Sequence, residues 1–378
     1  MDIIASWIWN PFLSIIYIEV GILFLVLTGA LAWKKGFQEF LQILKSDKEV
    51  TEERHISHTK AFITSLAATV GVGNLAGVGT AIHLGGPGAL FWMWISALLG
   101  MTFRMTSTYM SLKDQPESVD SPLFATPMSY LEKYAKGSWS WIPLVVAGLI
   151  ISIGLVMGNL IQSNSVAYAL NGEFGISKVI VAVVLAGFVA LVILGGLQSI
   201  VSYSTKIAPW MMLIYVGAGL ILLFSQPLQA MQALWSVFYY AFNPWSAAGG
   251  VAGYTIMQTI QFGISRGIFS HGSGIGIAPF LQSANRDHPA TGAYMAALVP
   301  FFDTIVICTI TALVILTGNH WLEETGAYLT VYSFESFYGK IGGLTVIFCL
   351  VIFAFTTIIS WSHYAERCFG YLGGKNVM

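Results

Sequence analysis

One apolar segment of this chain cannot be a regular membrane helix along its whole length. Residues 59–82 are long enough to cross a bilayer, yet they contain the run Thr69-Val70-Gly71-Val72-Gly73-Asn74-Leu75-Ala76-Gly77. Glycine weakens a helix, and backbone that leaves the helix inside a membrane is tolerated only against protein or a water-filled cavity. The segment therefore predicts a polar site in the middle of a membrane domain.

The composition of the whole chain agrees with this prediction. Of 378 residues, 56% are hydrophobic and 9% are charged, whereas soluble domains carry about 25% charged residues. A net charge of −1, without a run of Lys or Arg, gives no basis for binding nucleic acid. The three cysteines, Cys308, Cys349 and Cys368, have no metal-ligand spacing and do not suggest a disulfide framework. The sequence indicates an integral membrane protein.

Nine apolar runs approach the length of about 20 residues that a membrane helix needs, and we treat residues 1–378 as one transmembrane domain. The predicted spans are 11–33, 59–82, 88–112, 141–170, 178–198, 206–224, 249–275, 290–317 and 341–366. With the N-terminus outside, only Lys178 and Lys340 of the loop cations lie outside, and the others are cytoplasmic. This bias predicts a multi-pass protein of the plasma (inner) membrane with residues 34–58 in the cytoplasm. Residues 36–58 have the pattern of a surface helix.

The seventh predicted span is interrupted by small residues in the same way as the second. It contains the run Gly267-Ile268-Phe269-Ser270-His271-Gly272-Ser273-Gly274-Ile275-Gly276. Counted from the second span, the two broken spans are the first and the sixth. Glycine-interrupted segments at corresponding places in two halves indicate an inverted-repeat secondary transporter. The amino ends of half-helices suit a carboxylate, and freed carbonyl oxygens suit a sodium ion.

Several blocks of sequence, in their order and spacing, resemble the alanine/glycine:cation symporter family of amino acid carrier proteins. The blocks are residues 69–78, 85–94, 266–270, 302–304 and 353–357. The resemblance covers residues 55–373. It implies an all-α polytopic membrane protein with the LeuT-like inverted-repeat transporter fold, five plus five helices, and an extra N-terminal helix. It also implies sodium-coupled transport of small neutral amino acids.

The chain departs from the family pattern in three places. Where the family reads Phe-Ser-Asn-Glu-Ala-Gly, residues 269–274 read Phe-Ser-His-Gly-Ser-Gly, so that His271 and Gly272 replace Asn and Glu. Ser107 stands where the family has a Glu in the second core helix. The chain ends at Met378, where the family continues through two more helices, so the second repeat is expected to be incomplete.

The substrate-binding residues that we predict lie on both breaks and on two neighbouring spans. At the first break, polar side chains and small residues favour binding over a mere close contact between helices, which remains the alternative. The resemblance implies that Gln162 lies on the substrate-facing helix and contacts the ligand. The alternative is that Gln162 only forms a hydrogen bond between helices. The full predicted set is Thr69, Gly71, Gly73, Asn74, Gln162, Phe269, Ser270, His271 and Trp361.

A sodium ion is predicted beside the first break. It is expected as the coupling ion, and no cofactor is expected. Its ligands would be the carbonyl oxygens of Ala67 and Val70 and the hydroxyls of Thr356 and Thr357. The sodium site of the wider fold favours this role for the threonines, and bonding back to their own helix is the alternative. Asp303 lies inside the eighth span, where a carboxylate either serves function or pairs with Arg104 or Arg266.

The leading functional hypothesis is sodium-coupled symport of alanine or glycine into the cell by alternating access. The alternative is a transport-inactive, degenerate or truncated carrier that binds or senses an amino acid. An intramembrane enzyme is not expected, because no catalytic or metal-binding arrangement of side chains occurs at suitable spacing in the spans. The partners expected are therefore the small neutral amino acid, sodium and the lipid bilayer. The sequence leaves open whether the coupling ion is sodium or a proton.

Overall fold

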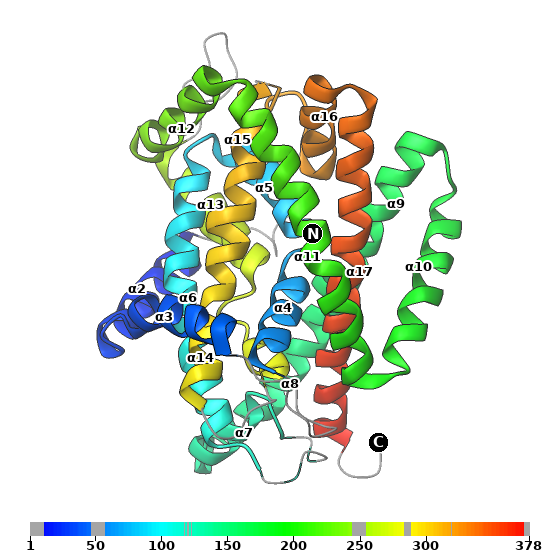
Figure 1. The fold of residues 1–378 in the computed structure, drawn as a ribbon. Helices are drawn as coiled ribbons and strands as arrows, with labels where there is room; N and C mark the ends of the chain where they lie inside the picture. Colours follow the sequence, from blue (N-terminus) through cyan, green and yellow to red (C-terminus); the bar gives the residue numbers. More distant parts are fainter. Residues whose placement is uncertain are drawn as a thin grey trace.

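The computed structural model shows a bundle of helices (Figure 1). Every regular element within the described residues is helical. The described residues are 11–46, 57–116, 118, 121, 123–243, 255–282, 289–318 and 320–373. Residues 47–56 of the predicted cytoplasmic segment and residues 249–254 of the seventh predicted span lie outside this part of the chain.

The elements follow the chain in two stretches. The first contains α2 (Pro11–Leu27), α3 (Leu31–Ser46), α4 (His58–Thr69), η1 (Gly73–Gly77), α5 (Val78–Gly85), α6 (Ala89–Lys113), α7 (Met128–Tyr134), η2 (Gly137–Trp139), α8 (Ile142–Ile153), η3 (Gly154–Leu160), α9 (Ile161–Phe174) and α10 (Lys178–Ile193). The second contains α11 (Gly196–Ser225), α12 (Pro227–Phe242), α13 (Ile256–His271), η4 (Ala278–Leu281), α14 (Pro289–Pro300), η5 (Phe301–Cys308), α15 (Thr309–Gly318), α16 (Gly326–Tyr338) and α17 (Lys340–Gly373). The segments η1, η3 and η5 are π-helical, a conformation frequent at functional sites.

Several of these helices can cross a membrane. Five helical stretches are long and apolar enough: Ala89–Lys113, Gly137–Phe174, Gly196–Ser225, Pro289–Gly318 and Lys340–Gly373. The number rises to seven if two bent helix pairs each count as one span. One pair is α2 with α3, bent by 67°, and the other is α4 with η1 and α5, bent by 53°. The chain is therefore a multi-pass membrane protein.

The first predicted span, 11–33, runs across the bend between α2 and α3. Gly29 and Ala30 have φ of +59° and +60°, and these two left-handed residues end the first helix. The amphipathic helix expected from residue 36 therefore already begins at Leu31. Trp33 attaches α3 to α6, because its Nε1 donates to the carbonyl of Leu98 at 3.1 Å.

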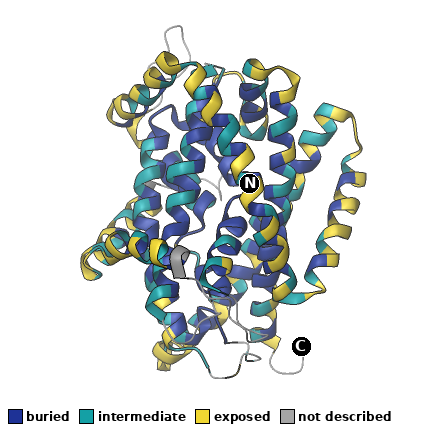
Figure 2. Ribbon diagram, in the orientation of Figure 1, coloured by how far each residue is buried: buried dark blue, intermediate teal, exposed yellow. Residues whose placement is uncertain are grey.

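The centre of the bundle is formed by helices whose backbones approach closely. A Cβ on Gly263 of α13 would lie 2.5 Å from the carbonyl oxygen of Ala89 in α6, so only glycine fits there. Figure 2 shows that buried residues concentrate in these central helices, whereas the peripheral helices α10 and α12 carry many exposed ones. This close packing fixes the position of α13, which carries the second break.

Candidate functional site

The first break separates α4 from η1. Val70 is extended, with φ −69° and ψ 107°, so the regular helix ends at Thr69. The next two amides, those of Gly71 and Val72, donate to side chains and not to the helix carbonyls four residues earlier. The carbonyl oxygen of Ala67 thereby loses its helical donor. The break therefore leaves a backbone carbonyl oxygen inside the bundle without its usual helical donor.

Two side chains bind the amides that the break frees. The N–H of Gly71 donates to Asn74 Oδ1 at 2.9 Å, and the N–H of Val72 donates to Gln162 Oε1 at 3.0 Å. The other end of the same amide, Gln162 Nε2, donates to the carbonyl of Met157 at 3.3 Å. Gln162, which the sequence predicts as a ligand contact, thus holds the unwound chain from α9.

The second break follows α13, whose last residue is His271. Gly272, Gly274 and Gly276 have φ of +63°, +91° and +90°, a region that residues with a Cβ rarely adopt. This conformation explains why Gly272 suits the position where the family has Glu. Arg104 Nη1 of α6 donates to the carbonyl of His271 at 2.9 Å. A buried guanidinium therefore caps the carboxyl end of α13, where the helix dipole is negative.

The two breaks lie against one another. A Cβ on Gly73 would lie 3.0 Å from Ser270 Cα and 3.3 Å from Phe269 Cδ1, so η1 and the last turn of α13 are in direct contact. Residues 67–77 and 268–278 are thus both interrupted and adjacent in space. This is the arrangement on which the carrier hypothesis depends.

A small cavity lies where the two breaks meet the neighbouring helices. Its volume is about 20 Å³, roughly the space of one or two water molecules. Seven residues predicted for the substrate or the sodium ion line it: Thr69, Gly73, Gln162, Phe269, Ser270, Thr357 and Trp361. The other six predicted residues are outside the lining: Gly71, Asn74 and His271 of the substrate set, and Ala67, Val70 and Thr356 of the sodium set. The other lining residues, Ala68, Met157, Gly272 and Ile277, carry no polar side chain that could have identified them in the sequence.

Trp361 of α17 borders this cavity and contacts η3. A Cβ on Gly158 would lie 2.4 Å from Trp361 Cβ, and a Cβ on Gly154 would lie 3.6 Å from Trp361 Cε3. The indole therefore fits against a helix face made of glycine. The sequence placed Trp361 at the site but gave no indication that these two glycines receive it.

The carboxylate of Asp303, in η5, joins the two breaks. Asp303 is fully buried; its Oδ1 accepts from Asn74 Nδ2 at 2.8 Å, and its Oδ2 accepts from Ser270 Oγ at 2.7 Å. Thr304 Oγ1 donates to the same Oδ2 at 2.8 Å. Cys308 Sγ lies 3.2 Å from Ser270 Oγ. Because Asn74 belongs to η1 and Ser270 to α13, one carboxylate bonds both interrupted helices.

Neutral donors, and not an arginine, surround this carboxylate. Among the residues that the structure describes, no ion pair joins Asp303 to Arg104 or Arg266. Sequence reasoning identified Asp303 as an intramembrane acid but missed its partners. Asn74 and Ser270 lie 229 and 33 positions away along the chain, so no local pattern could indicate these bonds.

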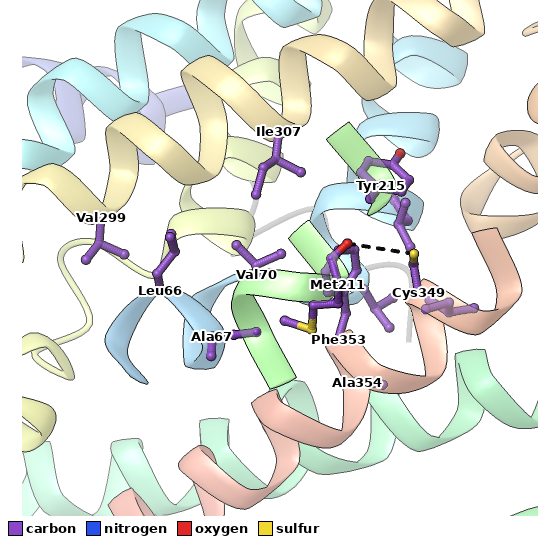
Figure 3. Close-up of a cluster of buried hydrophobic side chains, with 14 of the residues drawn as sticks. Leu66, Ala67, Val70, Met211, Tyr215, Val299, Ile307, Cys349, Phe353 and Ala354 are labelled. Atoms are coloured by element: carbon purple, nitrogen blue, oxygen red, sulfur yellow. Dashed lines mark hydrogen bonds between the residues drawn. The ribbon is translucent and has the colours of Figure 1, made fainter. Parts of the chain in front are cut away.

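The residues predicted to bind sodium are brought together in part. Thr357 Oγ1 donates to the carbonyl of Val70 at 3.3 Å, so α17 meets the first break here. Thr356 Oγ1 bonds the carbonyl of Phe353 in its own helix at 3.1 Å. Figure 3 shows Ala67, Val70 and Phe353 in one buried apolar cluster. Of the four predicted sodium ligands, the Val70 carbonyl and the Thr357 hydroxyl are therefore the two that the structure brings into contact.

His271 is directed toward α6 and away from the cavity. Its Nδ1 accepts from the N–H of Ser273 at 3.1 Å, and its Nε2 lies 3.2 Å from Ser96 Oγ. Because Nδ1 is an acceptor, Nε2 carries the proton and donates to Ser96. Ser107, the other departure from the family pattern, donates to the carbonyl of Arg104 in its own helix at 3.3 Å. Both residues therefore bond protein groups beside the site.

Several apolar helices of membrane-spanning length, with a small cavity where the break after α4 meets the break after α13, are the features of a membrane transporter. The chain belongs to the sodium:alanine symporter family, whose model matches residues 1–378. This membership confirms the resemblance seen in the sequence. The family is one of transporters and not of enzymes.

Named relatives are similar to the chain over nearly its whole length. The sodium/alanine symporter AgcS of Methanococcus maripaludis is 36% identical over 384 residues, which cover 99% of this chain and 83% of the relative. The amino-acid carrier protein AlsT of Bacillus subtilis is 31% identical, with 97% of this chain and 77% of the relative covered. The probable sodium/glutamine symporter GlnT of the same organism is 30% identical, with 97% and 75% covered.

Proposed function

We propose that this protein carries a small neutral amino acid, alanine or glycine, into the cell together with sodium. Family membership supports sodium-coupled amino acid symport, and the name of the AgcS relative supports alanine. The observation that carries the proposal is the cavity between two interrupted helices, the place where secondary transporters bind substrate.

The architecture that we propose is the LeuT-like inverted repeat, with α2 as the extra N-terminal helix and residues 1–378 as one domain. In this assignment α4, η1 and α5 form the first core helix and α13 forms the sixth. The distribution of Lys and Arg supports an N-terminus outside and residues 34–58 in the cytoplasm of a cell bounded by the plasma membrane. Alternating access then opens the cavity to each side in turn.

The substrate would replace a hydrogen bond that the unwound chain makes in this structure. In this structure, Gln162 Oε1 accepts from the N–H of Val72. We assign the substrate carboxylate to this N–H, near the amino end of η1, where the helix dipole is positive. Gln162 would then turn its carbonyl oxygen to the ammonium group of the substrate. Phe269 and Trp361, which also line the cavity, would limit the size of the substrate side chain.

Sodium would bind on the other side of the first break. The carbonyls of Ala67 and Val70 and the hydroxyl of Thr357 provide hard oxygen ligands, and Thr356 joins them by rotating its hydroxyl away from its own helix. An ion there would tie α17 to the unwound chain. The same segment contacts substrate through Val72, so ion and substrate would stabilise one conformation together.

Uptake into proteoliposomes tests the proposal. We expect radiolabelled alanine to accumulate when sodium is high outside, and not when potassium replaces sodium or when only a proton gradient is imposed. Unlabelled glycine should compete with it. Binding of alanine without gradient-driven accumulation would contradict symport and support a transport-inactive carrier that binds or senses the amino acid.

A further inference from the structure

The buried surface of the π-helical segment η3 consists of glycine. Its two buried residues are Gly154 and Gly158, and its other residues are half-buried or exposed. Both glycines lie against Trp361, the residue of α17 that lines the central cavity. A wall residue of the cavity therefore packs against a helix face without side chains.

The two glycines differ in how closely they approach Trp361. A Cβ on Gly158 would overlap Cβ and Cγ of Trp361 and would lie 2.8 Å from its Cδ2. A Cβ on Gly154 would lie 3.5 Å from the Trp361 carbonyl oxygen and 3.6 Å from its Cε3, which are ordinary van der Waals distances. A methyl group is therefore tolerated at position 154 but displaces Trp361 when it is placed at position 158.

The central cavity is free space that Trp361 can enter. The indole is buried, and its ring meets the ring of Tyr364 edge to face at a centroid distance of 5.5 Å. Tyr364 packs in turn against Phe280, with ring centroids 5.0 Å apart. Because densely packed rings resist displacement on that side, movement of Trp361 away from η3 is taken up by the cavity.

A hydrogen bond fixes the register of α17 on η3. Ser362 Oγ donates to Asn159 Oδ1 at 3.4 Å, one residue along each segment from the contact of Trp361 with Gly158. Helix α17 would lose this bond if it slid along η3 to relieve an overlap at Gly158. The indole therefore has to move instead.

The same turn of η3 also holds Gln162. The carbonyl of Met157 accepts from Gln162 Nε2 at 3.3 Å, and Met157 and Trp361 both line the cavity. Residues 157 and 158 thus position two of the side chains that we assign to the substrate. One acts through its backbone carbonyl, and the other acts because it has no side chain. This double contact gives a physical role to the π-helical conformation, which is frequent at functional sites.

We propose that Gly158 determines the substrate specificity of this carrier by positioning Trp361. With hydrogen at position 158, the indole lies against η3 and leaves the cavity to the side chain of the amino acid. With a methyl group there, the indole enters the cavity and alanine is excluded before glycine, because glycine has no side chain. Gly158 is outside the cavity lining and is therefore a positioning residue. The inference rests on the proposed function for the identity of the ligand.

Equilibrium binding of radiolabelled alanine and glycine to the purified full chain in sodium tests the role of Gly158. One methylene group in an apolar pocket typically changes discrimination by about 10–200-fold. We expect Gly158→Ala to lower the ratio of alanine affinity to glycine affinity about tenfold. Gly154→Ala adds the same methyl group to the same buried face of η3 and should leave the ratio unchanged. A general structural defect would weaken both affinities equally, and that result in Gly158→Ala would overturn the proposal.

A second pair of variants provides the test if Gly158→Ala does not fold. Trp361→Phe has a smaller ring and should bind 2-aminobutyrate, which is one methylene larger than alanine. Gly158→Ala combined with Trp361→Phe displaces the smaller ring into the cavity. It should still bind alanine but should bind 2-aminobutyrate about tenfold more weakly than Trp361→Phe does. Equal affinity of the two proteins for 2-aminobutyrate would overturn the proposal.

The outcomes separate this proposal from the proposed function. If the unmodified protein accumulates alanine in a sodium gradient but Gly158→Ala keeps the original affinity ratio, only the role of Gly158 fails. If the ratio falls in Gly158→Ala while the unmodified protein shows no sodium-driven accumulation, symport fails and the role of Gly158 stands.

Discussion

The amide of Asn74 and the carboxylate of Asp303 are joined by a hydrogen bond of 2.8 Å, although 229 positions separate them. Asn74 also accepts the N–H of Gly71 at 2.9 Å through its Oδ1. One side chain therefore fixes the unwound backbone at one end and a buried carboxylate at the other. The same carboxylate bonds Ser270 on the second broken helix. Both broken helices therefore share Asp303 as a hydrogen-bond partner.

Removing Asn74 should destabilise the closed site. Asn74→Ala leaves a fully buried carboxylate without one of its donors, which costs about 1.5–3 kcal/mol for a hydrogen bond to a charged group. We expect a lower melting temperature and loss of sodium-driven uptake. Thr317→Val, which removes a hydroxyl bonded only to Leu313 within α15, is the matched control. Equal melting temperatures for the two variants would contradict this role of Asn74.

Adding one methyl group at Gly73 should separate the broken helices. In Gly73→Ala the new carbon would lie 3.0 Å from backbone Cα of Ser270, and overpacking of this kind costs about 1–3 kcal/mol. We expect uptake to fall about tenfold or more. Gly148→Ala, where nothing lies within 4 Å of the new carbon, should transport normally. Normal uptake by Gly73→Ala would contradict the prediction that transport depends on close contact between the two broken segments.

Thr357 and Thr356 should differ in their effect on sodium. Thr357→Val removes the hydroxyl that reaches the first break, so the sodium concentration for half-maximal uptake should rise about tenfold, near 1.4 kcal/mol of binding free energy. Thr357→Ser keeps the hydroxyl and should restore the affinity. Thr356→Val should have the smaller effect, because that hydroxyl bonds its own helix. Sodium titrations of uptake measure all three, and an unchanged titration in Thr357→Val would exclude Thr357 as a ligand.

Arg104 should stabilise the end of α13. Arg104→Met keeps much of the side-chain volume but removes the donor to the carbonyl of His271, at a cost of about 1.5–3 kcal/mol. We expect a lower melting temperature, partly recovered in Arg104→Lys. Lys113→Met, at the exposed end of the same helix, should melt as the unmodified protein does. A stable Arg104→Met protein would show that Gly272 alone suffices to end α13.

The sequence by itself determined that this chain is a multi-pass membrane transporter and where its helices are interrupted. Apolar length and glycine content are local properties, so residues 67–77 and 268–278 could be predicted as interrupted segments before any contact was known. The family followed from the order of short blocks along the chain. The bend at Gly29 and Ala30 was not predicted, because these two left-handed residues lie in an apolar run without unusual hydropathy.

Only the tertiary structure decided which polar groups meet. Gln162 was expected to face the ligand and bonds the backbone of Val72, while His271 was expected at the substrate and bonds Ser96. Ser270 was expected to touch substrate and also donates to Asp303. Hydrogen-bond partners in a membrane bundle come from different helices, and their choice depends on how those helices approach. No periodicity within one helix contains that information.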